Sequence, residues 1–317
     1  MMGNPTIDKI LEKLGQKDLL DILVNKLTAS ELNSLLLEVY KMKTEALSPA
    51  ELLNGYIANR FVKPACTNPR EYLQLEADFY RIAEALSFTP IELSPVAQLG
   101  TCSVIATVNQ NKVISALRGT EVMADVTNAL ALHICSLIKE MEPQDREVHS
   151  PIRYCTSHRL IRTQKFDIPG FSAHFKIFCM VSSGRDTGSY GFEKQHLLEH
   201  ITAYKEILRQ LFHIEHIKIK LIKRGGYTDP EGLVDRILHH IHNNTDGISI
   251  HTENPGSEHD NQYYKGIQFK VNVDIKGSDL EIADGGFVDW SQKLLGNKKE
   301  RMLISGMGVD FLLRLMK

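Results

Sequence analysis

The first 90 residues show the spacing of apolar positions that is typical of amphipathic helices. Apolar side chains recur every three or four residues from Leu32 to Tyr40 and again from Leu73 to Leu86. The segment 61–67 lacks this period. Three helix starts carry a capping side chain three positions ahead of a glutamate: Thr28 with Glu31, Ser48 with Glu51, and Asn68 with Glu71. We therefore expect a small helical domain over 1–65 and a separate core over 66–317.

From Thr89 onward the pattern changes to short β-branched runs separated by turns. Helices are expected at 121–139, 192–212 and 230–242 and at the C-terminal end. Strands are expected at 91–99, 102–110, 112–117, 153–163, 174–182, 217–222, 264–275 and 280–283. Because helices and strands do not alternate regularly, the pattern favours an α+β core with a mostly antiparallel sheet over a doubly wound parallel sheet.

Composition narrows the class of protein. The 317 residues carry a formal net charge of -2, so no global basic field favours nucleic acid as a partner. No stretch approaches the roughly 20 apolar residues that cross a bilayer. Five widely spaced cysteines suggest neither a disulfide framework nor a zinc site. We expect a cytoplasmic protein with no membrane partner.

The common catalytic motifs are absent from the sequence. It contains no phosphate loop, dinucleotide fingerprint, H-E-x-x-H or G-x-S-x-G. Cys155 with His158, or Cys179 with His174, would be a nucleophile and a base, but cysteines in apolar strands usually pack as small hydrophobes. A solvated helix face is favoured over a metal site for the histidine group, which comprises His239, His240, His242, His251 and His259.

Taken in chain order, the segments from Thr67 to Lys317 resemble the catalytic core of class II aminoacyl-tRNA synthetases. The resemblance is strongest to the histidyl-tRNA synthetase branch and its paralogue, the regulatory subunit of ATP phosphoribosyltransferase. The helix 69–86 and the strand TPIELSP resemble motif 1, which builds the dimer interface in that family. SALRGTEVMADVT resembles the L-R-P-[ED]-x-T segment, with Arg118 matching its arginine and Glu121 close behind.

Four further segments extend the resemblance. HRLIRTQ, with Arg159, resembles motif 2, and HFKIFCMVSSG resembles the element that holds the amino-acid substrate. NQYYKGIQF carries the Tyr263 and Tyr264 pair, and IADGGFVDW carries Gly285 and Gly286. ISGMGVDFLLRL resembles motif 3. No anticodon-binding domain is expected after it.

Apolar residues stand where the family has charged or polar ones. Ile161 replaces the glutamate that reads adenine, Ile177 and Val181 replace the residues that bind the amino acid, and Phe287 and Phe311 replace two arginines. Amino-acid activation needs cations and carboxylates fixed in the cleft. The resemblance implies a ligand-binding cleft, without catalytic or metal-binding residues, formed by Arg118, Glu121, Arg159, Ile161, Ile177, Val181, Tyr263, Tyr264, Gly285, Gly286 and Phe311.

Three functions remain open on this basis. The favoured hypothesis is a non-catalytic, homodimeric paralogue that needs no cofactor and acts as a regulatory subunit, through a small anionic ligand or a partner enzyme. The alternative is an adenylating ligase that uses ATP and a changed acid substrate, with Arg118 and Arg159 on phosphate. The third is a tRNA-related accessory protein, which rests on the basic stretch from Lys218 to Arg224.

Overall fold

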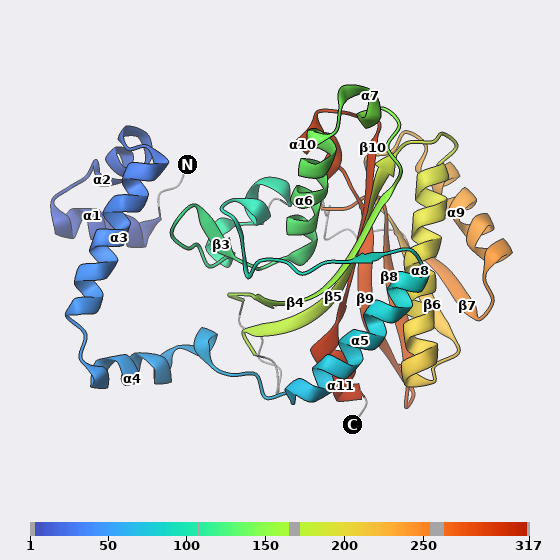
Figure 1. The fold of residues 1–317 in the computed structure, drawn as a ribbon, viewed down its shortest axis with the longest axis horizontal. Helices are drawn as coiled ribbons and strands as arrows, with labels where there is room; N and C mark the ends of the chain where they lie inside the picture. Colours follow the sequence, from blue (N-terminus) through green and yellow to red (C-terminus); the bar gives the residue numbers. More distant parts are fainter. Residues whose placement is uncertain (1–3, 107, 165–171, 254–262, 316–317) are drawn as a thin grey trace.

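The computed structural model describes residues 4–106, 108–164, 172–253 and 263–315. Its N-terminal region, residues 4–62, is called the arm below. The arm consists of α1 (Pro5–Leu14), α2 (Leu19–Asp21), α3 (Ala29–Glu45) and α4 (Pro49–Ala58), with a π-helical turn at Ile22–Lys26 and a 3-10 turn at Arg60–Val62. No side chain from residue 4 to residue 71 is buried. Figure 1 shows the arm standing away from the rest of the chain.

The helix starts predicted from capping residues are present. Reciprocal capping boxes form between Thr28 and Glu31 at α3 and between Ser48 and Glu51 at α4. Asn68 caps the next helix differently, by accepting a hydrogen bond from the amide of Arg70. The division of the chain into domains at residue 65 stays a prediction.

An eight-stranded sheet follows the arm. Its order is β1-β4-β5-β10-β9-β8-β6-β7, and all neighbours are antiparallel except the pairs β1·β4 and β6·β7. This confirms the predicted α+β class with a mostly antiparallel sheet. The strands are β1 (Thr89–Pro90), β4 (Ile152–Ile161), β5 (His174–Arg185), β6 (Ile217–Lys223), β7 (Ile248–Glu253), β8 (Lys265–Ile275), β9 (Ser278–Val288) and β10 (Glu300–Gly308).

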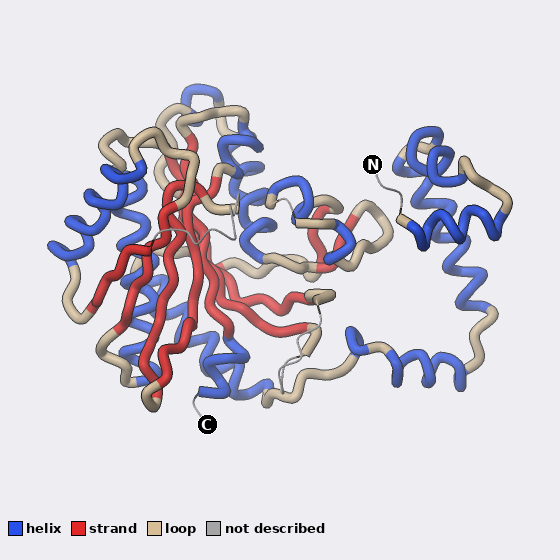
Figure 2. Tube along the Cα trace, turned by 180° about the vertical axis from the view of Figure 1, so that it is seen from behind, coloured by secondary structure: helices blue, strands red, loops and turns tan. Residues whose placement is uncertain are grey.

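Helices cover both faces of this sheet (Figures 1 and 2). One face, called the α8 face, packs against α5 (Pro69–Ala85), α8 (Gly191–Phe212), α9 (Pro230–Asn244) and α11 (Val309–Leu315). The other, called the α6 face, packs against α6 (Val126–Glu140) and α10 (Trp290–Leu295). A short helix, α7 (Pro143–Arg146), follows α6. Among the residues described, no helix is both long and apolar enough to cross a bilayer.

The strands expected between 91 and 117 are largely wrong. This region forms a small sheet of β2 (Val96–Gln98) and β3 (Thr120–Val122), with a π-helical turn at Thr101–Ile105 and a 3-10 turn at Gln110–Lys112. The buried Glu121 carboxylate accepts hydrogen bonds from the amides of Gly100 at 2.9 Å and Cys102 at 3.0 Å, and from Gln110 Nε2 at 2.9 Å. These contacts satisfy backbone donors that a sheet would otherwise pair.

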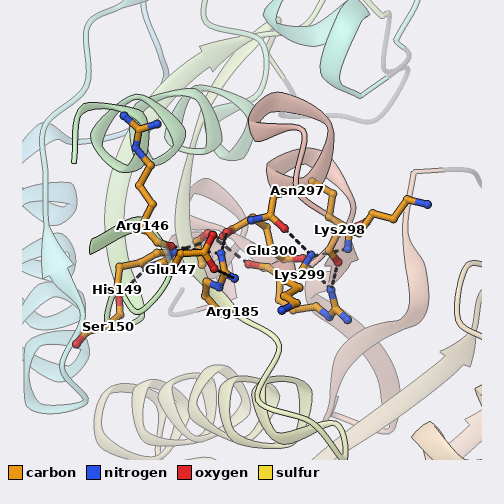
Figure 3. A network of polar contacts seen from close by, with 12 residues as sticks. Arg146, Glu147, His149, Ser150, Arg185, Asn297, Lys298, Lys299 and Glu300 are labelled. Atoms are coloured by element: carbon orange, nitrogen blue, oxygen red, sulfur yellow. Dashed lines mark hydrogen bonds and ion pairs between the residues drawn. The ribbon is translucent and has the colours of Figure 1, made fainter. Parts of the chain in front are cut away.

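Two polar clusters hold β5 and β10 in place. On the α8 face, the buried His200 ring lies between Ser182 Oγ at 3.0 Å and Ser305 Oγ at 2.8 Å. Burial lowers the pKa of His200 to about 3, so this ring is neutral. At one end of the two strands, Arg185 pairs with Glu300 at 3.0 Å and with Glu147 at 3.1 Å (Figure 3). The centre of the sheet is therefore tied both to α8 and to the loop after α7.

Candidate functional site

A cleft opens on the α6 face of the sheet. It consists of two adjoining cavities of about 370 and 270 Å³. The lining residues common to both are Asp125, Arg162, Tyr263, Tyr264 and Asp284. An open groove of about 790 Å³ lies beside α5, but six of its nine lining residues are polar and it lacks such a convergence of aromatic and charged groups.

Asp125 occupies the N-cap position of α6. Its Oδ1 accepts hydrogen bonds from the amide of Thr127 at 2.9 Å and from the Thr127 hydroxyl at 2.7 Å. Its Oδ2 accepts one from the Tyr263 hydroxyl at 3.2 Å. The start of the helix thus places a carboxylate at the cleft wall, where the helix dipole also favours negative charge.

Asp284 lies on β9 and faces the same cleft. It accepts hydrogen bonds from the Tyr264 hydroxyl and from Gln268 Nε2, both at 3.2 Å. The Arg224 guanidinium donates to Gln268 Oε1 at 2.6 Å, which turns the Gln268 amide group toward Asp284. Burial is the main cause that raises the pKa of Asp284 from 3.8 to about 6, against the lowering effect of Gln268.

Each of the two tyrosines donates a hydrogen bond to one of the carboxylates, Tyr263 to Asp125 and Tyr264 to Asp284. Their rings meet edge to face at 4.9 Å between centroids. Burial raises the pKa of both hydroxyls well above 10, so they remain protonated donors. Tyr264 fits closely because Gly286 has no side chain: a Cβ there would lie 2.6 Å from Tyr264 Cδ1.

Arg162 supplies positive charge just beyond the end of β4. Its guanidinium carbon lies 5.5 Å from the centroid of the Phe175 ring, and its Nε donates to the carbonyl oxygen of Ala124 at 3.5 Å. Phe175 and Ile177 form an apolar wall next to it. Lys112 lines the other cavity. An arginine beside an apolar wall makes strong charge-assisted hydrogen bonds with an anion because water is excluded.

Three of the residues expected in the cleft line it, namely Ile177, Tyr263 and Tyr264. Arg159 does not, and its expected position is corrected. It lies on the α8 face of the sheet, where its guanidinium contacts His174 Nδ1 at 3.0 Å and stands over the Tyr72 ring. Side chains alternate along a strand, so Leu160 and Arg162 point to one face and Arg159 to the other.

Arg118, Glu121 and Phe311 also lie elsewhere than expected. Arg118 is exposed in the turn before β3, with a φ of 64°, and its amide donates to Asn33 Oδ1 at 2.6 Å. Glu121 is buried as the carboxylate that binds the loop amides. Burial acts to raise the pKa of Glu121, but those hydrogen bonds outweigh it and hold the pKa below its usual range. Phe311 packs into the core on the α8 face.

The remaining expected residues belong to the sheet itself. Alternation along β4 places Ile161 on the face opposite Leu160. Val181 is fully buried under α6. Gly285 and Gly286 do not line the two cavities: Gly285 lies against β10, and Gly286 lies behind the lining residue Tyr264. Phe287 is buried in the core on the α8 face.

Sequence reasoning missed Asp125, Arg162 and Asp284 as cleft residues. Asp125 carried a readable signal, since D-V-T opens the apolar helix pattern in the way a capping residue does. Arg162 stands two positions after the buried Leu160. Side chains two positions apart on a strand point to the same face of the sheet, so this spacing predicts that Arg162 lies on the face of Leu160. No local signal marked Asp284, which stands beside a glycine pair in an apolar strand.

The other chemical candidates do not form sites in the described chain. Cys155 and Cys179 are buried, and burial raises the pKa of the Cys155 thiol to about 12 and that of Cys179 well above 9. The described residues contain no group of three or more histidine, cysteine or acidic side chains suited to a metal ion. His259 lies outside the described residues.

Solved structures match this chain, although no family model and no curated protein does. The S. aureus histidyl-tRNA synthetase matches with a TM-score of 0.60 and 12% identity over 80% of this chain and 68% of that one. A Bacillus halodurans protein described as an ATP phosphoribosyltransferase regulatory subunit/histidyl-tRNA synthetase matches with a TM-score of 0.60 and 14% identity over 80% and 82%. The histidyl-tRNA synthetase of Nostoc sp. PCC 7120 gives 0.57 and 15% over 81% and 74%.

These identities are too low to transfer an activity, and they establish the architecture alone. The shared architecture includes the antiparallel sheet and its flanking helices, which position the cleft described above. The chain therefore has the fold of the class II aminoacyl-tRNA synthetase catalytic domain, as the order of its sequence segments predicted.

Proposed function

We propose that the protein is a non-catalytic relative of the class II synthetases that binds a small anionic ligand in the cleft and acts as a regulatory subunit. The observation that carries this proposal is the charge of the cleft lining. Among its described residues the cations are Lys112 and Arg162, and they share the lining with the carboxylates of Asp125 and Asp284. The formal charges of this set nearly cancel.

Adenylate formation would need a different distribution of charge. A nucleoside triphosphate brings several negative charges. Its reaction is accelerated by cations that bind the transition state more strongly than the ground state. Two cations beside two carboxylates suit one acidic group better than a triphosphate. Phe287 and Phe311, which stand where the family has arginines, carry no charge, and both pack in or against the core on the α8 face.

The lining also suggests the shape of the ligand. An acidic group would meet Arg162, and an apolar body would pack against Phe175 and Ile177. A donor group on the ligand would face the Asp284 carboxylate, which shares its hydrogen bonds with Tyr264 and Gln268. To the small anionic ligand expected from the sequence, the cleft thus adds an apolar body and a polar contact with the sheet.

Calorimetric titration and ATP/pyrophosphate exchange test the proposal. We expect no exchange with any amino acid, weak binding of ATP, and binding of at least one member of a panel of small carboxylates and phosphate esters. Arg162→Gln should weaken that binding about tenfold or more, the loss of one charge-assisted pair. Arg159→Gln, three residues away on the opposite face, is the matched control and should leave binding unchanged.

Two results would contradict this function. Tight ATP binding or adenylate formation would replace it with the adenylating ligase. Binding of neither ATP nor any acid in the panel would leave a role exercised through the protein surface alone.

A further inference from the structure

Large apolar side chains on the surface are concentrated in the arm. Of the twenty exposed ones in the described residues, fifteen lie between residues 10 and 62. Those on α3 and α4 recur at helical spacing and form continuous stripes. The α3 stripe contains Leu35, Val39 and Met42, and the α4 stripe contains Leu52, Leu53, Tyr56 and Ile57, with exposures between 41% and 63%.

The exposed area of the chain is larger than a compact monomer of this mass would have. A chain of 35.8 kDa is expected to expose about 13,300 Å² when folded as one compact body. This chain exposes 18,164 Å², an excess of about 4,900 Å². The interface of an obligate homodimer buries about 2,000 to 5,000 Å² over both chains, so the excess is sufficient to form one.

The arm helices also lack the packing that normally maintains helices. Helices shorter than about 12 to 15 residues are marginal in water by themselves, and α1 and α4 have 10 residues each. A single chain buries none of their side chains. A hydrogen bond from the Arg118 amide to Asn33 and another from Arg60 to the Gln164 carbonyl join the arm to the core. Such contacts position the arm but cover little apolar surface.

We propose that α3 and α4 form the interface of a symmetric homodimer, by packing on α3 and α4 of a second copy of this chain. α3 and α4 run crosswise to each other (Figure 1), so each would lie across the same helix of the partner at a twofold axis, and each stripe would cover the same stripe of the partner. The charge of the arm supports a second copy over a charged partner: residues 4–62 contain eight acidic and seven basic side chains, so two arms repel each other little.

The position of the arm permits this arrangement. Figures 1 and 2 show α3 and α4 projecting from the core, joined to α5 by one connecting segment. The proposed interface is separate from the cleft and is an alternative to the predicted dimer through α5, which no observation tests. It therefore stands independently of the proposed ligand.

Light scattering on the full-length protein with size-exclusion chromatography tests the proposal. The wild type should have a mass of about twice 35.8 kDa at micromolar concentration. The double variant Leu53→Asp and Ile57→Asp changes side chains that a single chain leaves 58% and 63% exposed, so the core fold should survive. It should weaken dimerisation at least a hundredfold and give the monomer mass at the same concentration.

Val148→Asp is the matched control, because Val148 is 78% exposed but lies outside the arm, in the loop after α7. This variant should remain dimeric. A monomeric wild type would overturn the proposal and leave the arm to a different protein. A dimer that persists in the double variant would also overturn it and would place the interface elsewhere, for example on α5. Ligand binding in the cleft should be the same in the double variant as in the wild type. The dimer proposal and the ligand proposal can therefore fail independently of each other.

Discussion

Replacement of Asp284 by asparagine should stabilise the protein, although it removes a charged residue from the candidate site. The structure raises the pKa of this carboxyl group from 3.8 to about 6, chiefly by burial. A raised pKa means that the folded state binds the proton more tightly than the unfolded state. The ionised carboxylate therefore costs stability, and the cost grows from about pH 4 and is complete above pH 6.

The magnitude follows from the size of the pKa change. Two pKa units correspond to about 3 kcal/mol, and water in the cleft should reduce this to roughly 2 kcal/mol at pH 8. The carboxamide of the Asp284→Asn variant would keep an acceptor for Tyr264 and for Gln268, which now donate to Asp284 at 3.2 Å. For a core of this size, 2 kcal/mol corresponds to an increase in Tm of about 4 °C.

Urea unfolding of the wild type and of Asp284→Asn at pH 4 and pH 8 measures the effect. The gain of the variant should be large at pH 8 and should shrink to a small fraction at pH 4. Asp246→Asn, at an exposed position, is the control and should show no such dependence. An Asp284→Asn variant that is less stable than the wild type at pH 8, or equally shifted at both pH values, would refute the reasoning.

Two further variants test parts of the structure around the cleft. Glu121→Ala would leave the backbone amides of Gly100 and Cys102 and the side-chain amide of Gln110 without their acceptor. The free energy of unfolding in urea should fall by roughly 3 kcal/mol. A loss below about 1 kcal/mol would show that water replaces the carboxylate as acceptor. Gly286→Ala places a Cβ 2.6 Å from Tyr264 Cδ1 and 2.7 Å from the Ile267 carbonyl oxygen, and should lower the free energy of unfolding by roughly 2 kcal/mol. In the control Gly225→Ala the new Cβ has no neighbour within 4 Å, so this variant should be as stable as the wild type. Equal stabilities of the two variants would contradict the close approach at Gly286.

Long periodic elements were predictable from the sequence, and segments held by single buried side chains were not. The helix expected at 192–212 is α8 at Gly191–Phe212, and the strand expected at 174–182 is the first part of β5. β7 was missed because it is a short, mostly exposed strand. β7 pairs in parallel with β6, and the two strands are separated in the chain by the crossover helix α9. The region 91–117 was assigned to strands because its β-branched residues gave no sign of the Glu121 carboxylate that organises its turns.

The candidate site was predicted in part for the same reason. The tyrosine pair carried a motif that can be read locally, and both tyrosines line the cleft. The choice between Arg159 and Arg162 depended on strand parity, which a motif of a few residues does not define but the buried Leu160 does. Asp284 acquires its role from Tyr264 and Gln268 on the neighbouring strand segment, a relation that exists after the sheet has formed.

The double use of Asp125 limits how this cleft can diverge during evolution. One oxygen of its carboxylate begins α6 and the other meets Tyr263 in the cleft. Substitutions of Asp125 are therefore confined to the few small polar residues that can also cap a helix, whichever ligand the cleft binds. Phe175 and Ile177 make packing contacts that other apolar side chains can also make, so homologues that changed their ligand should have diverged first along the apolar wall.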